Sequence, residues 1–169
     1  MKKYALSPGT SYDVQVTTTT VLGSTGTATV SVYVEYGPVV VKVKGGLFRS
    51  SAVDESLLLD ASLSEDQSVD PTKRSAGEKE KALAAEEEKL LSFSWDCSII
   101  SIVGYGGSCS HIFQKGASFT SSRIAVVNMT EGYLYLVNVV ATASDGRSNS
   151  ASITVTPTSS GSDSLLTHH

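Results

Sequence analysis

The feature that most constrains the fold is an internal repeat between the first and last thirds of the chain. Residues 12–32 align with residues 135–155 without a gap, at an offset of 123 residues (135 minus 12). The matching pairs include Tyr12 and Tyr135, Val14 and Val137, Val16 and Val139, Gly23 and Gly146, Ala28 and Ala151, and Val32 and Val155. We therefore expect the chain to be part of a tandem array, an organisation typical of extended proteins that provide span and surface.

The repeat divides the chain into unequal parts. We expect residues 1–36 to be the final strand hairpin of a preceding β-sandwich module, and residues 37–157 to be one complete module followed by a tail at 158–169. Gly37-Pro38 marks the boundary, because this pair of residues punctuates regular structure. A chain of 169 residues with 40% hydrophobic residues has enough apolar material for one well-formed core.

Alternating apolar and polar residues predict antiparallel strands. Residues 12–16 and 27–34 alternate with a period of two on either side of the Gly23/Gly26 turn, which predicts a β-hairpin. Further strands are predicted at residues 39–43, 57–59, 91–97, 123–127, 133–143 and 150–156. About seven short strands rich in Thr, Ser and Val predict an all-β fold, an immunoglobulin- or fibronectin-III-like antiparallel sandwich. Phe93, Trp95 and Cys97 are expected on the inner face of one central strand.

One segment departs from the β pattern. Residues 72–90 are rich in Ala, Glu and Lys, which favours helix, but they carry only a short apolar stripe. We interpret this segment as a solvated, partly helical insertion between two strands. A projecting contact arm is the alternative.

The motifs of the module resemble a known family. The segments are residues 57–66 (LLLDASLSED), Val69-Asp70-Pro71, residues 91–97 (LSFSWDC), a second cysteine at Cys109, and the turn Asp145-Gly146-Arg147. Together they resemble the receptor-for-egg-jelly (REJ) module and the related PKD-type immunoglobulin-like repeats of polycystin-1-like proteins. The resemblance covers residues 37–157. It implies an ectodomain piece of a cell-surface or extracellular-fibre protein.

The two repeated tyrosines have a structural interpretation. Residues 6–14 resemble the corner of fibronectin type III modules, in which a tyrosine hydroxyl near a strand start bonds to backbone upstream. Tyr12 and Tyr135 are therefore expected to be structural. A buried tyrosine needs a partner for its hydroxyl, and that corner supplies one.

The cysteines and one asparagine bear on the compartment. Cys97 and Cys109 are the only two cysteines and flank the loop Gly104-Tyr105-Gly106-Gly107, which favours a local disulfide; two buried free thiols are the alternative. Asn128-Met129-Thr130 is a glycosylation sequon, so Asn128 is a candidate glycosylated residue. Both features favour an extracellular or cell-surface location.

Composition and motifs argue against several classes of function. A net charge of −4 with scattered Lys and Arg does not suit nucleic-acid binding. No apolar run reaches membrane-spanning length. Apart from the terminal pair, His111 is the only histidine, no nucleophile elbow or zinc spacing is present, and the chain is predicted to be a non-enzyme without a cofactor. A calcium site from Asp60, Glu65, Asp66, Asp70 and Asp96 is the remaining metal hypothesis; turn capping and solvation are favoured over it.

We expect a non-catalytic module that serves adhesion, protein assembly or mechanical spacing, with protein partners or neighbouring modules. A carbohydrate-binding accessory module of a secreted enzyme is the alternative, with glycans as partners. One surface suggests assembly: Leu134 and Leu136 stand where the first copy has Ser11 and Asp13, which makes that strand apolar on both faces. Two isolated exposed leucines are the simpler explanation.

Overall fold

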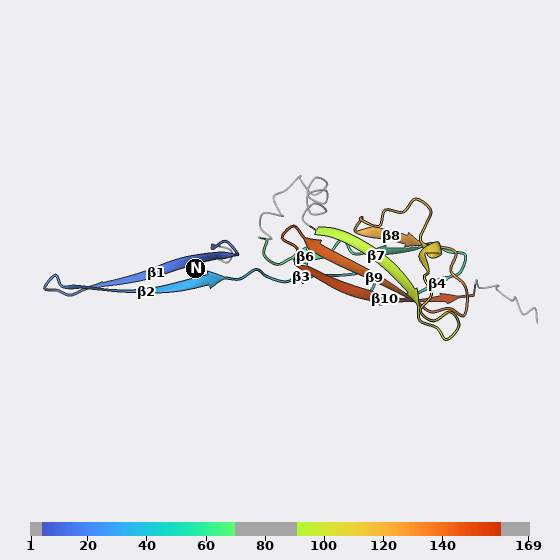
Figure 1. Ribbon diagram of the computed structural model, residues 1–169, viewed down its shortest axis with the longest axis horizontal. Coiled ribbons are helices and arrows are strands. Elements are labelled where there is room, and N and C mark those ends of the chain that lie inside the picture. Colours follow the sequence, from blue (N-terminus) through green and yellow to red (C-terminus); the bar gives the residue numbers. More distant parts are fainter. Residues whose placement is uncertain (1–4, 70–90, 160–169) are drawn as a thin grey trace, which may run out of the picture.

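A computed structural model describes residues 5–69 and 91–159, and places a β-module beside a separate N-terminal hairpin. The hairpin consists of β1 (Thr10–Thr19) and β2 (Thr25–Val34). It extends away from the module along the long axis of the molecule (Figure 1). The linker from Glu35 to Pro38 connects the two parts.

Four strands of the module form its principal sheet. These are β4 (Phe48–Ala52), β10 (Ser148–Thr158), β9 (Tyr135–Ala143) and β7 (Leu91–Ile99), in that spatial order. β9 pairs antiparallel with both of its neighbours, and β4 pairs parallel with β10. Two further pairs complete the module, β3 (Val39–Val40) with β6 (Glu65–Asp66) and β5 (Leu57–Asp60) with β8 (Arg123–Val126). A short 3₁₀ turn spans Ser110–Ile112.

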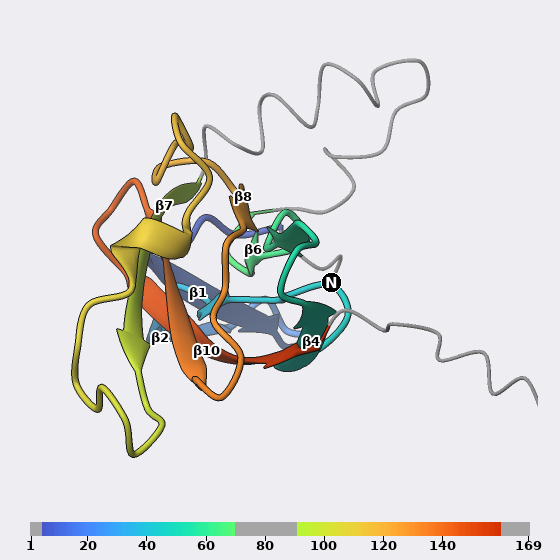
Figure 2. The same cartoon turned by 90° about the vertical axis from the view of Figure 1, so that its right-hand side faces the viewer.

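The core lies between the principal sheet and the two smaller pairs (Figure 2). Alternate residues of β9 are buried, because side chains of a strand point to opposite faces of its sheet. Trp95 is buried beside Phe93, and its indole N–H donates to the carbonyl oxygen of Ser121 at 2.8 Å. The predicted inner-face position of Trp95 is therefore confirmed, but the expectation of a central strand is wrong, because β7 lies at an edge of the principal sheet.

The two copies of the repeat have the same hairpin geometry. Tyr12 pairs with Val32 in β1 and β2, and Tyr135 pairs with Val155 in β9 and β10, so both copies share one register. The hydroxyl of Tyr12 accepts a hydrogen bond from the backbone N–H of Ser7 at 2.8 Å, and the hydroxyl of Tyr135 accepts one from Thr130 at 3.0 Å. Both acceptor–donor pairs are five residues apart, which confirms the predicted tyrosine corners.

Sequence and structure differ mainly at the edge strands. The sequence pattern did not predict β4 or β6. It predicted a strand at 39–43, where β3 covers only Val39–Val40, and a strand at 133–143, where β9 begins two residues later at Tyr135. β4 has no buried residue, and Phe48 and Ala52 are its only apolar residues, so it carries no alternation to detect. The expected insertion at 72–90 lies outside the described residues.

Candidate functional site

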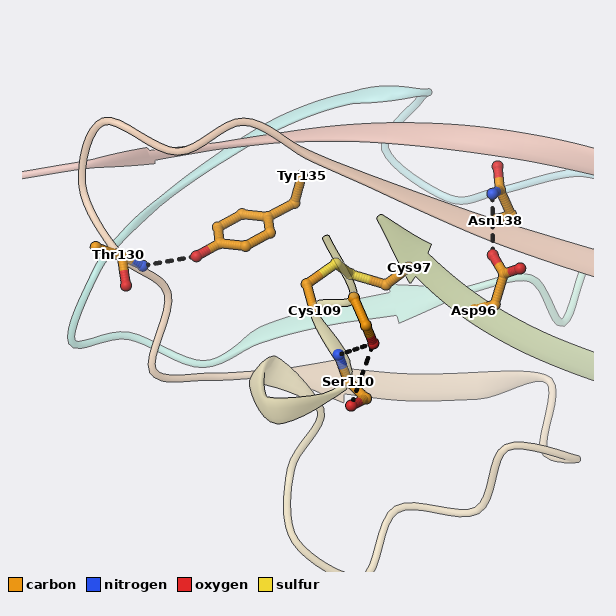
Figure 3. Close-up of a disulfide and its surroundings, with 8 residues drawn as sticks. Asp96, Cys97, Cys109, Ser110, Thr130, Tyr135 and Asn138 are labelled. Atoms are coloured by element: carbon orange, nitrogen blue, oxygen red, sulfur yellow. Dashed lines mark hydrogen bonds between the residues drawn. A yellow bond between two sulfur atoms is a disulfide. The ribbon is translucent and has the colours of Figure 1, made fainter. Parts of the chain in front are cut away.

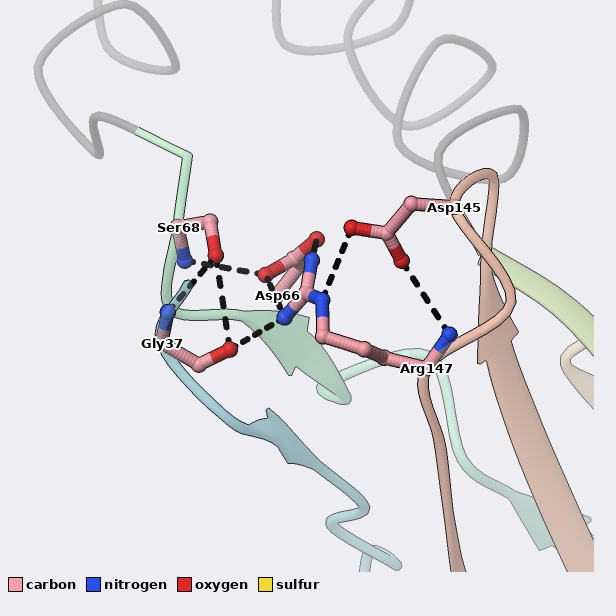
Figure 4. A network of polar contacts seen from close by, with 5 residues as sticks. All are labelled: Gly37, Asp66, Ser68, Asp145 and Arg147. Carbon is pink, nitrogen blue, oxygen red and sulfur yellow. Dashed lines mark hydrogen bonds and ion pairs between the residues drawn. The ribbon is translucent and has the colours of Figure 1, made fainter. Parts of the chain in front are cut away.

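The most elaborate polar site in the described residues lies where the linker enters the module. Arg147, in the turn between β9 and β10, reaches three segments at once (Figure 4). Its Nη1 donates to the carbonyl oxygen of Gly37 in the linker and to Asp66 Oδ1 at 3.1 Å. Its Nη2 donates to Asp66 Oδ2 at 2.7 Å, and its Nε donates to Asp145 Oδ2 at 2.8 Å. One guanidinium thus ties the linker to both the β6 segment and the β9–β10 turn.

Charge balance holds this group in place. The Asp66 side chain is only 9% exposed and that of Arg147 is 27% exposed, so the Asp66 carboxylate depends on Arg147 for compensation, while Arg147 is compensated by Asp66 and Asp145 together. Burial opposes ionisation of Asp66, but hydrogen bonds from Arg147 and from the backbone of Ser68 outweigh it and lower the pKa of Asp66. The same pairing raises the pKa of Arg147. Asp66 is therefore ionised throughout the neutral range.

An aromatic ring extends the site toward the hairpin. The Arg147 guanidinium carbon lies 4.9 Å from the centroid of the Tyr36 ring, a cation–π distance. The Tyr36 ring also lies against Gly9, in the turn before β1. A methyl group placed on the Gly9 α-carbon would lie 2.5 Å from the Tyr36 hydroxyl oxygen, and Gly9 has a φ of +72°, which favours glycine. Gly9, Tyr36 and Arg147 therefore form a continuous stack from hairpin to module.

Backbone contacts fix the linker itself. The N–H of Gly37 donates to Ser68 Oγ at 2.8 Å, and the N–H of Gln67 donates to the carbonyl oxygen of Pro38 at 3.1 Å. A methyl group at Gly37 would lie 2.8 Å from the backbone carbon of Gln67, so only glycine allows this approach. We call the set Gly9, Tyr36, Gly37, Asp66, Ser68, Asp145 and Arg147 the joint. It can hold a direction between two β units, because it restrains the linker from both sides.

The two cysteines are joined by a disulfide at the other end of the module (Figure 3). It connects the end of β7 to the 3₁₀ turn, with a sequence separation of 12, and Cys109 is fully buried. The loop that it closes carries Ile102, Val103 and Tyr105, which are 99%, 65% and 77% exposed. The bond thus pins the base of a projecting apolar loop.

Asn128 is exposed in the segment between β8 and β9, with a φ of +52°. Asparagine tolerates this conformation better than most residues. The sequon threonine, Thr130, is exposed and supplies the backbone N–H that binds Tyr135. Glycosylation of Asn128 stays a prediction.

Leu134 and Leu136 are half-buried. Leu136 pairs across the sheet with Thr154, which in turn pairs with Phe48, so the three side chains share the outer face. Phe48 is 84% exposed. The assembly surface expected from the two leucines therefore includes a more exposed aromatic side chain that the sequence did not single out.

The acidic residues of the calcium hypothesis do not converge. Asp60 pairs with Lys44 and Arg123 at 3.0 and 3.1 Å, Glu65 with Lys42 at 2.8 Å, and Asp96 accepts from Asn138 at 2.9 Å. Burial opposes ionisation of Asp60, but bonds from Ser62, Lys44 and Arg123 lower its pKa to about 2. Asp66 belongs to the joint, and Asp70 lies outside the described residues. Among residues 5–69 and 91–159, no group of three His, Cys, Asp or Glu side chains is placed to hold a metal ion.

His111 is exposed on the 3₁₀ turn. Within the described part of the chain, no helix is long and apolar enough to cross a membrane.

The joint was missed by the sequence interpretation, which treated Arg147 only as part of a family turn. One signal was available: Arg147 stands where the first copy has Ser24, so the charge is specific to the copy that contacts a linker.

Comparisons with known proteins place the chain in a family. No significant match to a curated protein is found. A solved structure of a nucleoside hydrolase-related hypothetical protein from Saccharophagus degradans, described as associated with carbohydrate metabolism, is 13% identical. The similarity covers 73% of this chain and 26% of that one, with a TM-score of 0.43. The REJ domain family model matches residues 1–161, hairpin included, which confirms the resemblance read from the motifs. The chain therefore belongs to the REJ domain family.

Proposed function

We propose that this chain is a non-catalytic, extracellular module of a cell-surface or filament protein, and that it spaces and orients neighbouring β units. The carrying observation is the contact of Arg147 with Gly37 and Tyr36, two residues of the linker through which the hairpin is attached. A flexible spacer would need no such contact. A hydrogen bond to the linker from an arginine that is itself ion-paired with Asp66 of the module supports a spacer of fixed direction.

We further propose that the module is an immunoglobulin- or fibronectin-III-like sandwich. The supporting features are the parallel contact of β4 with β10, the order β10-β9-β7 in one sheet, and the separate β5–β8 pair that faces it. The tyrosine corner before β9 agrees with this assignment. Sandwiches of this kind place their two ends far apart, which suits end-to-end stacking.

An extracellular location is supported by three observations. They are the disulfide, the exposed sequon at Asn128 and membership of the REJ domain family. Adhesion or assembly through the outer face around Leu136 and Phe48 is compatible with spacing, because a spacer presents its lateral faces to partners. The glycan-binding alternative gains no support, since the exposed aromatic side chains lie on separate elements: Tyr33, Tyr36, Phe48, Tyr105 and Phe119.

Small-angle X-ray scattering tests the spacing function. The wild-type protein should give the long maximum dimension of a hairpin held in line with the module. Arg147→Ser, which restores the residue of the first copy, should give a broader distance distribution. Arg123→Ser is the matched control, because it removes an arginine paired with Asp60 away from the joint. Identical distributions for all three proteins would contradict a fixed direction.

A further inference from the structure

The two hairpins of the repeat differ in what covers their inner faces. Val137, Val139, Ile153 and Val155 are fully buried in the module core. Their counterparts Val14, Val16, Val30 and Val32 are 48%, 59%, 58% and 40% exposed. The β1–β2 hairpin therefore shows to solvent a face that its own repeat encloses.

The buried copy shows what such a face is built to contact. Leu57 and Leu59 of β5 and Ile124 and Val126 of β8 are buried in the same cluster as the inner faces of β9 and β10. Strands β3 to β8 precede that hairpin in the chain, and residues 127–134 connect β8 to β9. The cover of the β9–β10 face thus comes from the chain just ahead of it.

The inner face is also the face that both copies share. Tyr12, Val14, Val16, Ala28 and Val32 are identical to their counterparts, and Val30 is replaced only by Ile153. On the outer face, Asp13, Gln15 and Thr17 stand opposite Leu136, Asn138 and Val140 in the alignment.

Turn geometry is shared as well. The N–H of Thr20 donates to the Ser24 carbonyl at 2.8 Å, and the N–H of Ala143 donates to the Arg147 carbonyl at 2.8 Å. The β1–β2 hairpin therefore keeps the strand register, the tyrosine-corner hydrogen bond and the inner side chains of β9–β10. These are the features that a covering layer contacts, whereas the outer faces of the two hairpins differ.

We propose that the apolar face of β1–β2, formed by Val14, Val16, Val30 and Val32, binds a β-layer like the β5–β8 pair, supplied by a segment joined ahead of the hairpin as residues 37–126 are joined ahead of β9–β10. A second molecule of this chain, bound through the same hairpin face, is a less favourable occupant of this surface. Four half-exposed valines offer on the order of a few hundred Å², whereas a stable interface needs about 800 Å² from each partner. The layer over β9–β10, in contrast, closes a complete core.

A fusion protein tests the proposal. Residues 37–126 are duplicated ahead of residues 4–169, so that Val126 is followed directly by Tyr4, which the alignment matches with Val127. Trp95→Phe in the original module leaves the added tryptophan as the single reporter, because the chain has one tryptophan. Fluorescence and iodide quenching then report whether the added layer folds onto the hairpin. Mass spectrometry reports whether its two cysteines pair.

The matched variants use two directly paired positions of the hairpin. Val14→Lys with Val30→Lys places two charges on the inner face, and Gln15→Lys with Thr29→Lys places two on the outer face. The added tryptophan should show blue-shifted emission and protection from iodide, both lost in the inner-face variant and kept in the outer-face variant. An exposed tryptophan in the unmodified fusion would overturn the proposal, as would equal effects of the two variants. Dimerisation of the unextended chain through this face, together with an exposed added layer in the fusion, would overturn it in favour of a second copy.

Discussion

Arg147 and Asp66, 81 residues apart in sequence, form a two-point ion pair in which Nη1 and Nη2 each bind one carboxylate oxygen, at 3.1 and 2.7 Å. The same Nη1 also donates to the carbonyl oxygen of Gly37. Because the linker carbonyl is bound by a group that is itself fixed by Asp66, the direction in which the chain leaves the hairpin depends on this pair. The proposed spacing function rests on that geometry.

Acid should weaken the module through Asp60. Its folded pKa of about 2 lies below the ordinary value of 3.8, so its ion pairs with Lys44 and Arg123 contribute stability that is present above about pH 4. That stability is lost as the pH falls from 4 toward 2, because the unfolded chain binds the proton first. Urea unfolding at pH 6, 4 and 2 should therefore show a smaller loss for Asp60→Asn than for the wild type. An equal loss in both proteins would contradict this role.

The disulfide should stabilise the fold measurably. Replacing both cysteines, as Cys97→Ala with Cys109→Ala, should lower the free energy of unfolding by about 3 kcal/mol, because the open loop regains entropy in the unfolded chain. Mass spectrometry of the unreduced wild type should show two hydrogens fewer than after reduction. Free thiols in the folded, air-exposed protein would rule the bond out.

Trp95 should be indispensable to the core. Trp95→Ala removes a buried side chain and should cost roughly 3–5 kcal/mol. Trp95→Phe keeps a ring but leaves the Ser121 carbonyl without its donor, and should cost less, roughly 1–3 kcal/mol. Native emission should be blue-shifted; a spectrum like that of free tryptophan would show that the strand faces the other way.

The outer face should govern self-association if it is an assembly surface. Phe48→Ser with Leu136→Ser should weaken self-association, because both side chains lie on one face of the sheet on either side of Thr154. The weight-average sedimentation coefficient at high protein concentration should therefore fall. Leu58→Ser, which removes an exposed leucine of β5, is the matched control. A second double variant, Leu134→Asp with Leu136→Lys, should weaken self-association as well. If it leaves self-association unchanged, the two half-buried leucines serve internal packing only.

Sequence patterns predicted the strands that bury alternate residues. β7, β9 and β10 have this pattern, because their inner residues meet one core and their outer residues meet water. The corner tyrosines were predictable for a related reason: Tyr12 and Tyr135 each have their donor five residues away, within local reach. β4 and β6 were not predictable, since β4 buries none of its residues and β6 has only two residues, so neither shows such alternation.

The joint was beyond reach of local patterns because its parts are far apart in the chain. Arg147 contacts Gly37 across 110 residues and Asp66 across 81, and only the pairing of β3 with β6 beside the β9–β10 turn brings them together. Nothing near Asp66 in the sequence distinguishes it from Asp60, which serves a different ion pair. Comparison of the two repeats could have drawn attention to Arg147, because the aligned residue in the first copy is the uncharged Ser24.

The distance between hairpin and module tests the central claim most directly. Labels carried by non-natural amino acids at Val21 and Phe48, which are 103% and 84% exposed, would report it by pulsed electron spin resonance without using the cysteines. We predict one narrow distance distribution for the wild type, and a broad one for Arg147→Ser together with a loss of roughly 2–4 kcal/mol of module stability from the uncompensated Asp66. Arg123→Ser should keep the narrow distribution. A broad distribution in the wild type, or a narrow one in Arg147→Ser, would contradict a joint that holds the hairpin in a fixed direction.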